Sequence, residues 1–383
     1  MHKLLMDLRY GLRQLAKSPG FTLTTVLMLA SGIGATTAIF SIVEAVLLRP
    51  LPFPQSDRVV VLSDRLSGVD IGTGSDEVGV TVPDIKAYVR DTQGFTALGG
   101  YQGAGYELSG KGEPAMVSAA RLTAGVFPAL GVSPQLGRVF TQQEDDNRVQ
   151  VVVLSHAAWV NRFHSDAHIL GQKILLDRKP YEVIGVMPAG FEFPLQAGQL
   201  NRTEIWVPMS FQPSELTPAS AANWSYQMVG RLKPGWSRQQ AQQDAERVAK
   251  EIMRNYPAMI ANLRISSVVR PLQEETVEDA KPLLRTLFLA VAVVLLIACV
   301  NFAGLMLVRA IRRQKEVALR LALGAKAGEI LRQAIVESLL LSVSGGVLGL
   351  ALAAVALRIG KSLLPESLPR ISEIGLNWYV VVF

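Results

Sequence analysis

The sequence has few of the residues from which metal and redox centres are built. Its 383 residues include one cysteine and four histidines. The single thiol, Cys299, excludes an intrachain disulfide framework and a cysteine-based zinc finger. His164 and His168 are spaced so that a helix would place both imidazoles on one face, but Ser165 stands where a zinc protease of this pattern has glutamate. We therefore predict no metal site.

Complete catalytic motifs are also lacking. Residues 105–111 (GYELSGK) match the first seven positions of a phosphate-binding P-loop, but Gly112 replaces the hydroxyl residue that binds Mg²⁺. Pro114 disfavours the helix that would cradle the phosphates. The sequence contains no Gly-x-Ser-x-Gly elbow, kinase signature or dinucleotide fingerprint. We expect a glycine-rich turn at residues 105–111, no cofactor and no enzyme activity.

Charged residues are scarce, and long apolar runs are present instead. Only 18% of the residues are charged and 49% are hydrophobic, which is unusual for a soluble protein. Residues 21–43, 286–308 and 338–357 carry no charge, and each run is long enough to cross a bilayer. The first run is too long for a cleavable signal peptide. We predict an integral membrane α-helical protein with three complete spans, and a fourth that begins near Trp378.

The net charge of +6 is concentrated beside these runs. Residues 1–20 contain four basic and one acidic residue, and residues 309–337 contain seven basic and three acidic residues. Residues 50–284 contain 22 basic and 25 acidic residues, so they supply no extended basic surface for nucleic acid. By the positive-inside rule, the N-terminus and residues 309–337 face the cytoplasm and the large middle region lies outside the cell.

This pattern divides the chain into four parts. Residues 1–20 predict a cytoplasmic amphipathic helix on the inner leaflet, ended by residues 18–20. Its apolar side contains Leu4, Leu5, Leu8, Leu12 and Leu15. The remaining parts are a transmembrane helix at 21–48, an α+β extracytoplasmic domain of two lobes at 49–285, and a membrane region at 286–383 with a cytoplasmic loop at 309–337.

Local signals predict several elements of the middle region. Residues 149–154 indicate a buried strand, and Ser155 caps a short helix that runs to Phe163. A hairpin is expected to turn at residues 177–179. Near the end of the region, we expect a helix capped by Ser237 that stops before Pro257, and then a strand at 263–270.

Small residues in the spans indicate close helix packing. Gly34 and Ala38 in the first run, and Gly345 and Gly349 in the third, are spaced by four residues and leave flat surfaces. One interpretation is that membrane helices are simply rich in glycine. The other is packing against a second copy of the chain or a second permease half. Asn301, in the middle of the second run, is expected to form a hydrogen bond to another helix.

The segment between the last two spans predicts two helical pieces hinged at Gly324 and Ala325. Its basic end, with Arg312, Arg313 and Lys315, is suited to anionic lipid headgroups, so the segment could be an anchoring loop. Apolar residues alternate with its charges at Val317, Leu319, Leu321 and Leu323. Exposed apolar surface surrounded by charge favours a protein partner on the cytoplasmic side.

Three separated stretches resemble one family. The stretch "RRQKEVALRLALGAKAGEILRQAIVESLLLSVSGGVLGLALA" resembles the FtsX-like permease domain of the MacB type. The stretch "DLRYGLRQLAKSPGFTLTTVLMLASGIGATTAIFSIVEAVLLRPLPF" is similar to the N-terminus of the orphan branch in which permeases are duplicated within one chain. "GVFPALGVSPQLGRVF" and "YEVIGVMPAGFEFP" are similar to the periplasmic core domain of the same family.

The resemblance implies an ABC transporter permease of the bacterial cytoplasmic (inner) membrane, without nucleotide chemistry of its own. A cytoplasmic ABC ATPase subunit would drive the periplasmic domain through a stalk and a coupling helix, for export or mechanotransmission. A second permease half or a homodimer is also implied. The residues placed in or beside the ATPase contact are Arg312, Arg313, Glu316, Arg320, Leu323, Gly324 and Ala325. A membrane sensor or scaffold that regulates envelope enzymes without transport remains the alternative.

Overall fold

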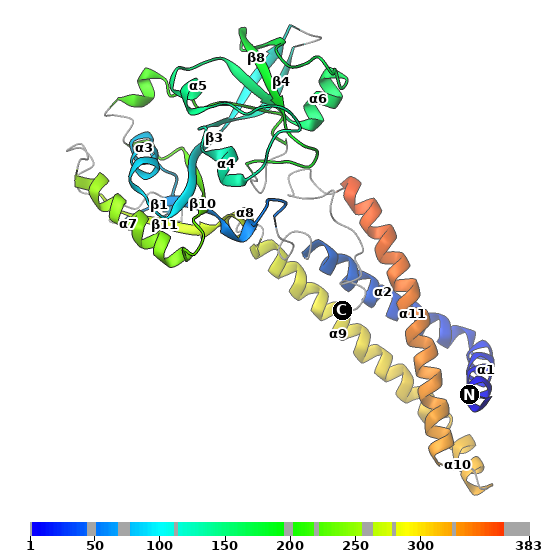
Figure 1. Ribbon diagram of the computed structural model, residues 1–383. Helices are drawn as coiled ribbons and strands as arrows, with labels where there is room; N and C mark the ends of the chain where they lie inside the picture. Colours follow the sequence, from blue (N-terminus) through cyan, green and yellow to red (C-terminus); the bar gives the residue numbers. More distant parts are fainter. Residues whose placement is uncertain are drawn as a thin grey trace. The chain divides into compact units, whose positions relative to one another are not determined.

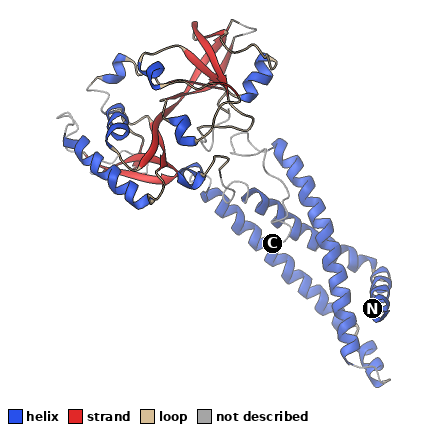
Figure 2. Cartoon of the chain, viewed as in Figure 1, coloured by secondary structure: helices blue, strands red, loops and turns tan. Residues whose placement is uncertain are grey.

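The computed structural model describes residues 2–43, 51–67, 77–110, 114–194, 202–217, 222–254, 263–277, 281–323 and 327–363. The chain forms two compact units. Met1–Arg49 and Asp279–Phe383 make one, here called the helical unit, and Pro50–Glu278 make the other, here called the inserted domain. Described strands occur only in the inserted domain (Figure 2). The chain is therefore a helical membrane protein with an α+β domain inserted after its first long helix.

The described part of the helical unit contains five helices. They are α1 (His2–Ala16), α2 (Pro19–Val43), α9 (Lys281–Arg312), α10 (Gln314–Ala322) and α11 (Ala327–Leu363). Three of them contain stretches long and apolar enough to cross a membrane, at Pro19–Ser41, Arg285–Arg312 and Ala327–Ile359. These stretches coincide with the three uncharged runs of the sequence. The run expected to open a fourth span at Trp378 lies outside the described residues.

Two helix boundaries differ from the sequence expectation. The break expected at residues 18–20 lies at Lys17 and Ser18, and Pro19 and Gly20 already form the first turn of α2, where proline is well tolerated because the first backbone N–H has no helical partner. The helix after the second run was expected to continue out of the membrane, but it breaks at Arg313. The side chain of Arg313 turns toward α11, as described below, and Gly324 and Ala325 lie outside the described residues.

Helix α1 packs against α11. A Cβ atom at Gly11 would lie 2.9 Å from Leu340 Cδ1, so the two helices approach closely there. Leu15, on the predicted apolar side, is buried, whereas Leu12 is 54% exposed. The side chains of Leu4, Leu5 and Leu8 lie outside the described part. Part of the apolar side of α1 is thus covered by protein, and Leu12 remains exposed.

The inserted domain alternates short helices with the strands of one sheet (Figure 1). Its strands are β1 (Val59–Ser67), β2 (Glu77–Val78), β3 (Phe95–Ser109), β4 (Ala115–Leu122), β5 (Leu136–Gly137), β6 (Val151–Leu154), β7 (Lys173–Leu176), β8 (Lys179–Val186), β9 (Ile205–Pro208), β10 (Gln227–Leu232) and β11 (Arg264–Pro271). Its helices are η2 (Ser56–Arg58), α3 (Val82–Asp91), α4 (Val126–Leu130), α5 (Gln142–Asp146), α6 (His156–Phe163), η3 (Pro213–Leu216), α7 (Arg238–Arg254) and α8 (Leu272–Val277).

The sheet has the order β11-β1-β10-β3-β4-β9-β6-β8-β5. The long strand β3 pairs with β10 through residues 95–101 and with β4 through residues 101–108, so it runs through both lobes. Strands β11, β1, β10 and the first half of β3 make the first lobe, and the strands from β4 to β5 make the second. The β4–β9 and β6–β8 pairs are parallel, and the other pairs are antiparallel. The domain thus has the α+β class expected from the sequence.

Strand β1 is covered by side chains on both of its faces. Val60 and Leu62 point into a core shared with α3 and α7, and Val59 and Val61 point into a core on the opposite face that contains Trp206. Successive side chains of a strand point to opposite faces, so a strand covered on both sides has to be apolar at every position. Helix α7 contributes alanines and a valine spaced by three or four residues to the first of these cores.

Local signals in this domain are confirmed. Strand β6 is buried throughout, and Ser155 Oγ accepts a hydrogen bond from the backbone N–H of Ala158 at the start of α6. The β7–β8 hairpin turns at Asp177 and Arg178, both with positive φ. The expectation of a glycine-rich turn at residues 105–111 is wrong for its first five positions, because they belong to β3, where residues 105–108 pair with β4 and Ser109 pairs with β7. Only Gly110 has the positive φ of a turn, and Lys111 lies outside the described residues.

A buried acid pair lies in the first lobe. Asp64 and Asp84 are both almost fully buried, and Tyr88 donates a hydrogen bond of 2.8 Å to Asp64 Oδ1. Burial, together with the charge of Asp84, raises the pKa of Asp64 well above its usual value of 3.8. The folded protein therefore holds a proton at Asp64 that the unfolded chain releases above about pH 4.

Stability should consequently fall as the pH rises from 4 through the folded pKa of Asp64. We expect the chain to unfold at a lower urea concentration at pH 8 than at pH 5, as measured by its tryptophan fluorescence, to which the buried Trp206 contributes. Asp64→Asn, which stays neutral, should reduce this difference. The pKa of Asp145, raised to about 6 by burial, acts in the same direction in both proteins and cancels in the comparison. An unchanged pH dependence in the variant would contradict the assignment.

Candidate partner-docking site

An ion-pair cluster joins the ends of α9 and α11. Glu337, on α11, accepts hydrogen bonds from Arg309, in the last turn of α9, and from Arg313, at the break before α10. The distance from Arg313 Nη1 to Glu337 Oε2 is 2.8 Å. The side chains of Glu337 and Arg309 are only 11% and 12% exposed. One buried carboxylate thus holds two guanidinium groups.

The cluster extends to a third helix. The guanidinium carbon of Arg309 lies 4.3 Å from the centre of the Phe21 ring, near the start of α2, which is the geometry of a cation–π contact. Phe21, Arg309, Arg313 and Glu337 are called the three-helix clasp below. Because its members come from α2, from α9 with the α9–α10 junction, and from α11, a displacement of any one of these helices has to strain or break the clasp.

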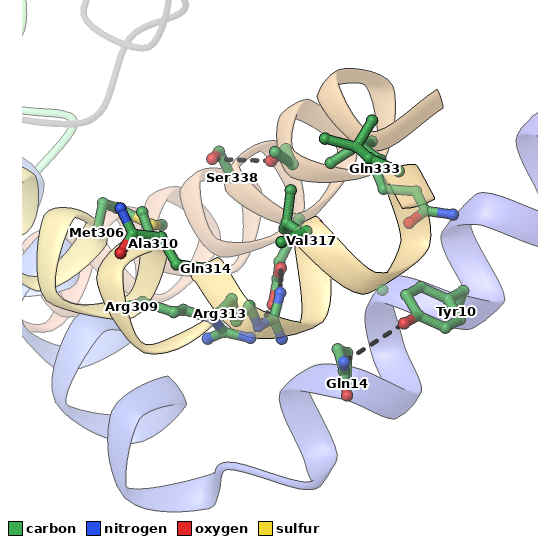
Figure 3. Close-up of a pocket in the computed structure, with 16 residues that line it drawn as sticks. Tyr10, Gln14, Met306, Arg309, Ala310, Arg313, Gln314, Val317, Gln333 and Ser338 are labelled. Atoms are coloured by element: carbon green, nitrogen blue, oxygen red, sulfur yellow. Dashed lines mark hydrogen bonds and ion pairs between the residues drawn. The ribbon is translucent and has the colours of Figure 1, made fainter. Parts of the chain in front are cut away.

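A cavity of about 480 Å³ adjoins the clasp. Its walls come from α1, α9, α10 and α11 (Figure 3). The apolar part of the lining includes Met306, Val317, Leu321 and Ile330. Tyr10 and Gln14 of α1 are joined by a hydrogen bond of 3.4 Å on one side of the cavity. Helix α10 is thus separated from α1 and α11 by open space along part of its length.

Helix α10 has two apolar sides. Val317 and Leu321 line the cavity. Leu319 and Leu323, also four residues apart, lie on the other side and are 63% and 80% exposed. Helix α10 lies between the two candidate spans that end at Arg312 and begin at Ala327. Its outer side therefore presents large apolar side chains outside the membrane stretches.

The structure places the predicted contact residues in this region, with gaps. Arg312 is exposed at the end of α9, and Arg313 belongs to the clasp. Glu316 and Arg320 lie on α10, but their side chains are outside the described part, as are Gly324 and Ala325 entirely. Glu337, Arg309 and Phe21 were not singled out from the sequence. The sequence offered one signal for this cluster. Glu337 directly precedes the third apolar run, and two arginines spaced by four positions, Arg309 and Arg313, follow the second run.

The glycines predicted to pack lie between α2 and α11 of the same chain. A Cβ atom at Gly34 would lie 2.9 Å from Gly349 O, and one at Gly345 would lie 2.6 Å from Leu29 Cβ. The backbones therefore approach closely, as small residues permit. Ala38 is half-buried on α2. In the described residues the glycines pack within the chain, and contact with a second copy or half stays a prediction.

Asn301 is exposed on α9, in the middle of the second candidate span. Among the described residues we find no hydrogen-bond partner for its side chain, although the sequence predicts one on another helix. An amide in the hydrocarbon region is costly unless it is paired. The predicted hydrogen bond of Asn301 to another helix therefore stays a prediction.

The remaining sequence candidates do not assemble into a reaction centre in the described residues. His164 ends α6 with a positive φ, and His168 is almost fully exposed near Asp166. Within the described ranges, no three histidine, cysteine, aspartate or glutamate side chains come together as a metal site would require. Gly105–Ser109, the P-loop-like residues, lie in a β-ladder and do not form a phosphate-binding loop.

Known families match most of the chain. The family described as MacB-like periplasmic core domain matches residues 22–248, and the FtsX-like permease C-terminal family matches residues 288–380. The macrolide export ATP-binding/permease protein MacB of Salmonella typhi is 28% identical over 237 residues, which are 62% of this chain and 35% of that protein. MacB of Escherichia coli (strain K12) is 28% identical over 227 residues, 59% of this chain and 33% of the relative. The match spans about a third of these relatives.

Solved structures also resemble the chain. The periplasmic region of MacB from Actinobacillus actinomycetemcomitans matches with a TM-score of 0.42 and 12% identity, over 59% of this chain and 94% of that one. The extracellular domain of the noncanonic ABC-type transporter YknZ from Gram-positive bacteria matches with a TM-score of 0.39 and 16% identity, over 55% and 99% of the two chains. The family assignment depends on the sequence matches, of which the first covers more than half of the chain. The chain therefore belongs to the family of membrane permeases that combine a MacB-like periplasmic core domain with an FtsX-like permease region.

Proposed function

We propose that the chain is the permease subunit of an ABC-type system of the MacB/FtsX type, with its N-terminus in the cytoplasm. A cytoplasmic ATPase subunit docks on α10, and ATP hydrolysis there moves the extracytoplasmic inserted domain, for export or mechanotransmission. The chain itself performs no catalysis. The partner supplies the nucleotide chemistry.

The outer side of α10 is the observation that carries this proposal. Leu319 and Leu323 expose most of their apolar surface on a helix between two membrane spans. In water such surface is unfavourable unless a partner covers it. Arg312, at the adjacent end of α9, is exposed and would flank the covered area with positive charge. A partner with an apolar groove and acidic edges complements this surface.

The three-helix clasp supports transmission from α10 into the membrane. Arg313 stands at the N-terminal end of α10 and is bound to Glu337 on α11, while Arg309 connects the same carboxylate to Phe21 on α2. A push on α10 thus acts on α9, α11 and α2 together. Helices α2 and α9 are also the two helices whose far ends continue into the inserted domain along the chain.

Placing charge on the outer side of α10 should remove the partner. We expect the double variant Leu319→Asp and Leu323→Asp, expressed in its native host, to co-purify at least about tenfold less ABC ATPase subunit than the parent, because burying an unpaired carboxylate costs more than 1.4 kcal/mol. Quantitative mass spectrometry of the purified complex gives the ratio.

Met116→Asp is the matched control. Met116 is 71% exposed on β4 of the inserted domain, so the substitution has the same chemistry without touching α10. It should leave the amount of ATPase unchanged. Equal recovery of the ATPase with the α10 double variant and with Met116→Asp would refute the proposed docking side.

A further inference from the structure

A cavity between the two lobes of the inserted domain has no role in the function proposed above. Its volume is about 240 Å³. One wall is α3, through Ile85, Lys86 and Val89, and another is formed by α5 and Arg148. The cavity is smaller than the roughly 300–1,000 Å³ typical of sites for drug-sized molecules. It therefore suits a molecule about as large as one or two amino acids.

The apolar part of the cavity is partly open to solvent. Val89 and Leu216 are 48% and 43% exposed. Behind them lie Ile85 and Leu98, which are buried, and Phe211, whose ring packs at 5.8 Å against Tyr226. Apolar surface at the opening and in the interior of one cavity favours a ligand with an apolar side chain.

Charges of both signs line the same cavity. Lys86 Nζ lies 5.9 Å from the centre of the Phe211 ring, and Arg148 Nε donates a hydrogen bond of 2.9 Å to Phe211 O. Opposite charge comes from α5: Asp146 Oδ1 accepts from the Gln142 amide at 3.0 Å, and Asp145 Oδ1 accepts from the Ser210 N–H at 2.7 Å.

The four charged groups just described interact with uncharged partners: an aromatic ring, backbone groups and a side-chain amide. Within the described part of the chain, Lys86, Arg148, Asp145 and Asp146 form no ion pair with one another or with another side chain. Arg90 differs, because its guanidinium is bound to Asp91 at 2.7 Å. Because these charges do not pair with one another, they remain available to a molecule that carries both signs.

We propose that this cavity binds a small zwitterionic molecule with an apolar side chain, of the class of apolar amino acids and dipeptides. The carboxylate of the ligand faces Lys86 and Arg148, its ammonium group faces Asp145 and Asp146, and its side chain covers Ile85, Val89 and Phe211. Because α3 belongs to the first lobe and α5 to the second, the bound molecule links the two lobes.

Calorimetry on the full chain in detergent tests the site, with leucyl-leucine as the probe. We expect saturable binding of one molecule per chain. N-acetyl-leucyl-leucine, which lacks the positive charge, and leucyl-leucinamide, which lacks the negative charge, should each bind at least about tenfold more weakly, because each loses one set of charge-assisted hydrogen bonds. Absence of saturable binding, or equal affinity for all three compounds, would overturn the proposal.

Two variants locate the binding. Lys86→Met keeps the length of the side chain and removes its charge, and Asp146→Asn keeps the shape of the carboxylate. Both residues are exposed, so both variants should fold, and each should weaken leucyl-leucine binding by about tenfold or more. Lys179→Met, on the exposed start of β8, is the control and should bind like the parent. Parental affinity in both cavity variants would place the ligand elsewhere and refute the assignment.

Discussion

Replacing Glu337 with leucine is expected to destabilise the helical unit by about 3–5 kcal/mol, because it leaves the buried guanidinium group of Arg309 without its carboxylate and removes the ion pair of the partly exposed Arg313. Leucine is a good helix former, so the loss cannot come from helix propensity. The measurement is the thermal unfolding temperature of the full chain in detergent. Glu329→Leu on the same helix is the matched control, because Glu329 is exposed in the first turn of α11, and it should leave the unfolding temperature nearly unchanged.

A double variant tests whether the stability lost in Glu337→Leu comes from the unpaired buried charge or from the loss of the contact between the helices. Replacing a complete buried ion pair with apolar residues is often neutral or stabilising, whereas removing one partner is costly. Arg309→Leu combined with Glu337→Leu should therefore recover most of the stability lost in Glu337→Leu, with Arg313, 30% exposed, still able to reach water. If Glu337→Leu unfolds at the same temperature as Glu329→Leu, the three-helix clasp does not hold these helices together.

The positions of the three candidate spans could be predicted because they depend on residues that are adjacent in the sequence. A span requires about 20 consecutive apolar residues, and the three uncharged runs coincide with the three candidate spans. The same holds for local elements such as the Ser155 cap and the hairpin at Asp177, where the deciding residues lie within a few positions. The P-loop-like stretch was misinterpreted in part, because pairing with β4 outweighed the turn tendency of its glycines.

The clasp could not be predicted, because its members are distant in sequence. Glu337 is 28 positions from Arg309 and 24 from Arg313, and their meeting depends on how α9 and α11 are rotated against each other. The sequence also did not distinguish the two sides of α10, because large apolar residues occupy every second position from Val317 to Leu323, which does not show a helical face.

Small residues in the spans were recognised, but their partner was not. The four-residue spacing indicates a flat helix surface and does not identify the helix that packs on it. In the structure, Gly345 and Gly349 face α2 of the same chain. The neighbouring Gly346 has no atom within 4 Å of the position where its Cβ would be. The two adjacent glycines therefore provide a direct test of which contact matters.

Gly345→Leu is expected to destabilise the helical unit by about 3 kcal/mol, because its Cβ alone would lie 2.6 Å from Leu29 Cβ, an atom fixed to the α2 backbone. Gly346→Leu should be neutral or slightly stabilising, since leucine favours the helix more than glycine does. Thermal unfolding in detergent gives the stability, and light scattering gives the mass of the protein particle. If Gly345→Leu lowered the particle mass and left the unfolding temperature unchanged, the glycine would serve contact between chains, and the α2–α11 packing described here would not be what it supports. Loss of stability at constant mass assigns Gly345 to the contact within one chain, which leaves the exposed side of α9 around Asn301 available for another helix.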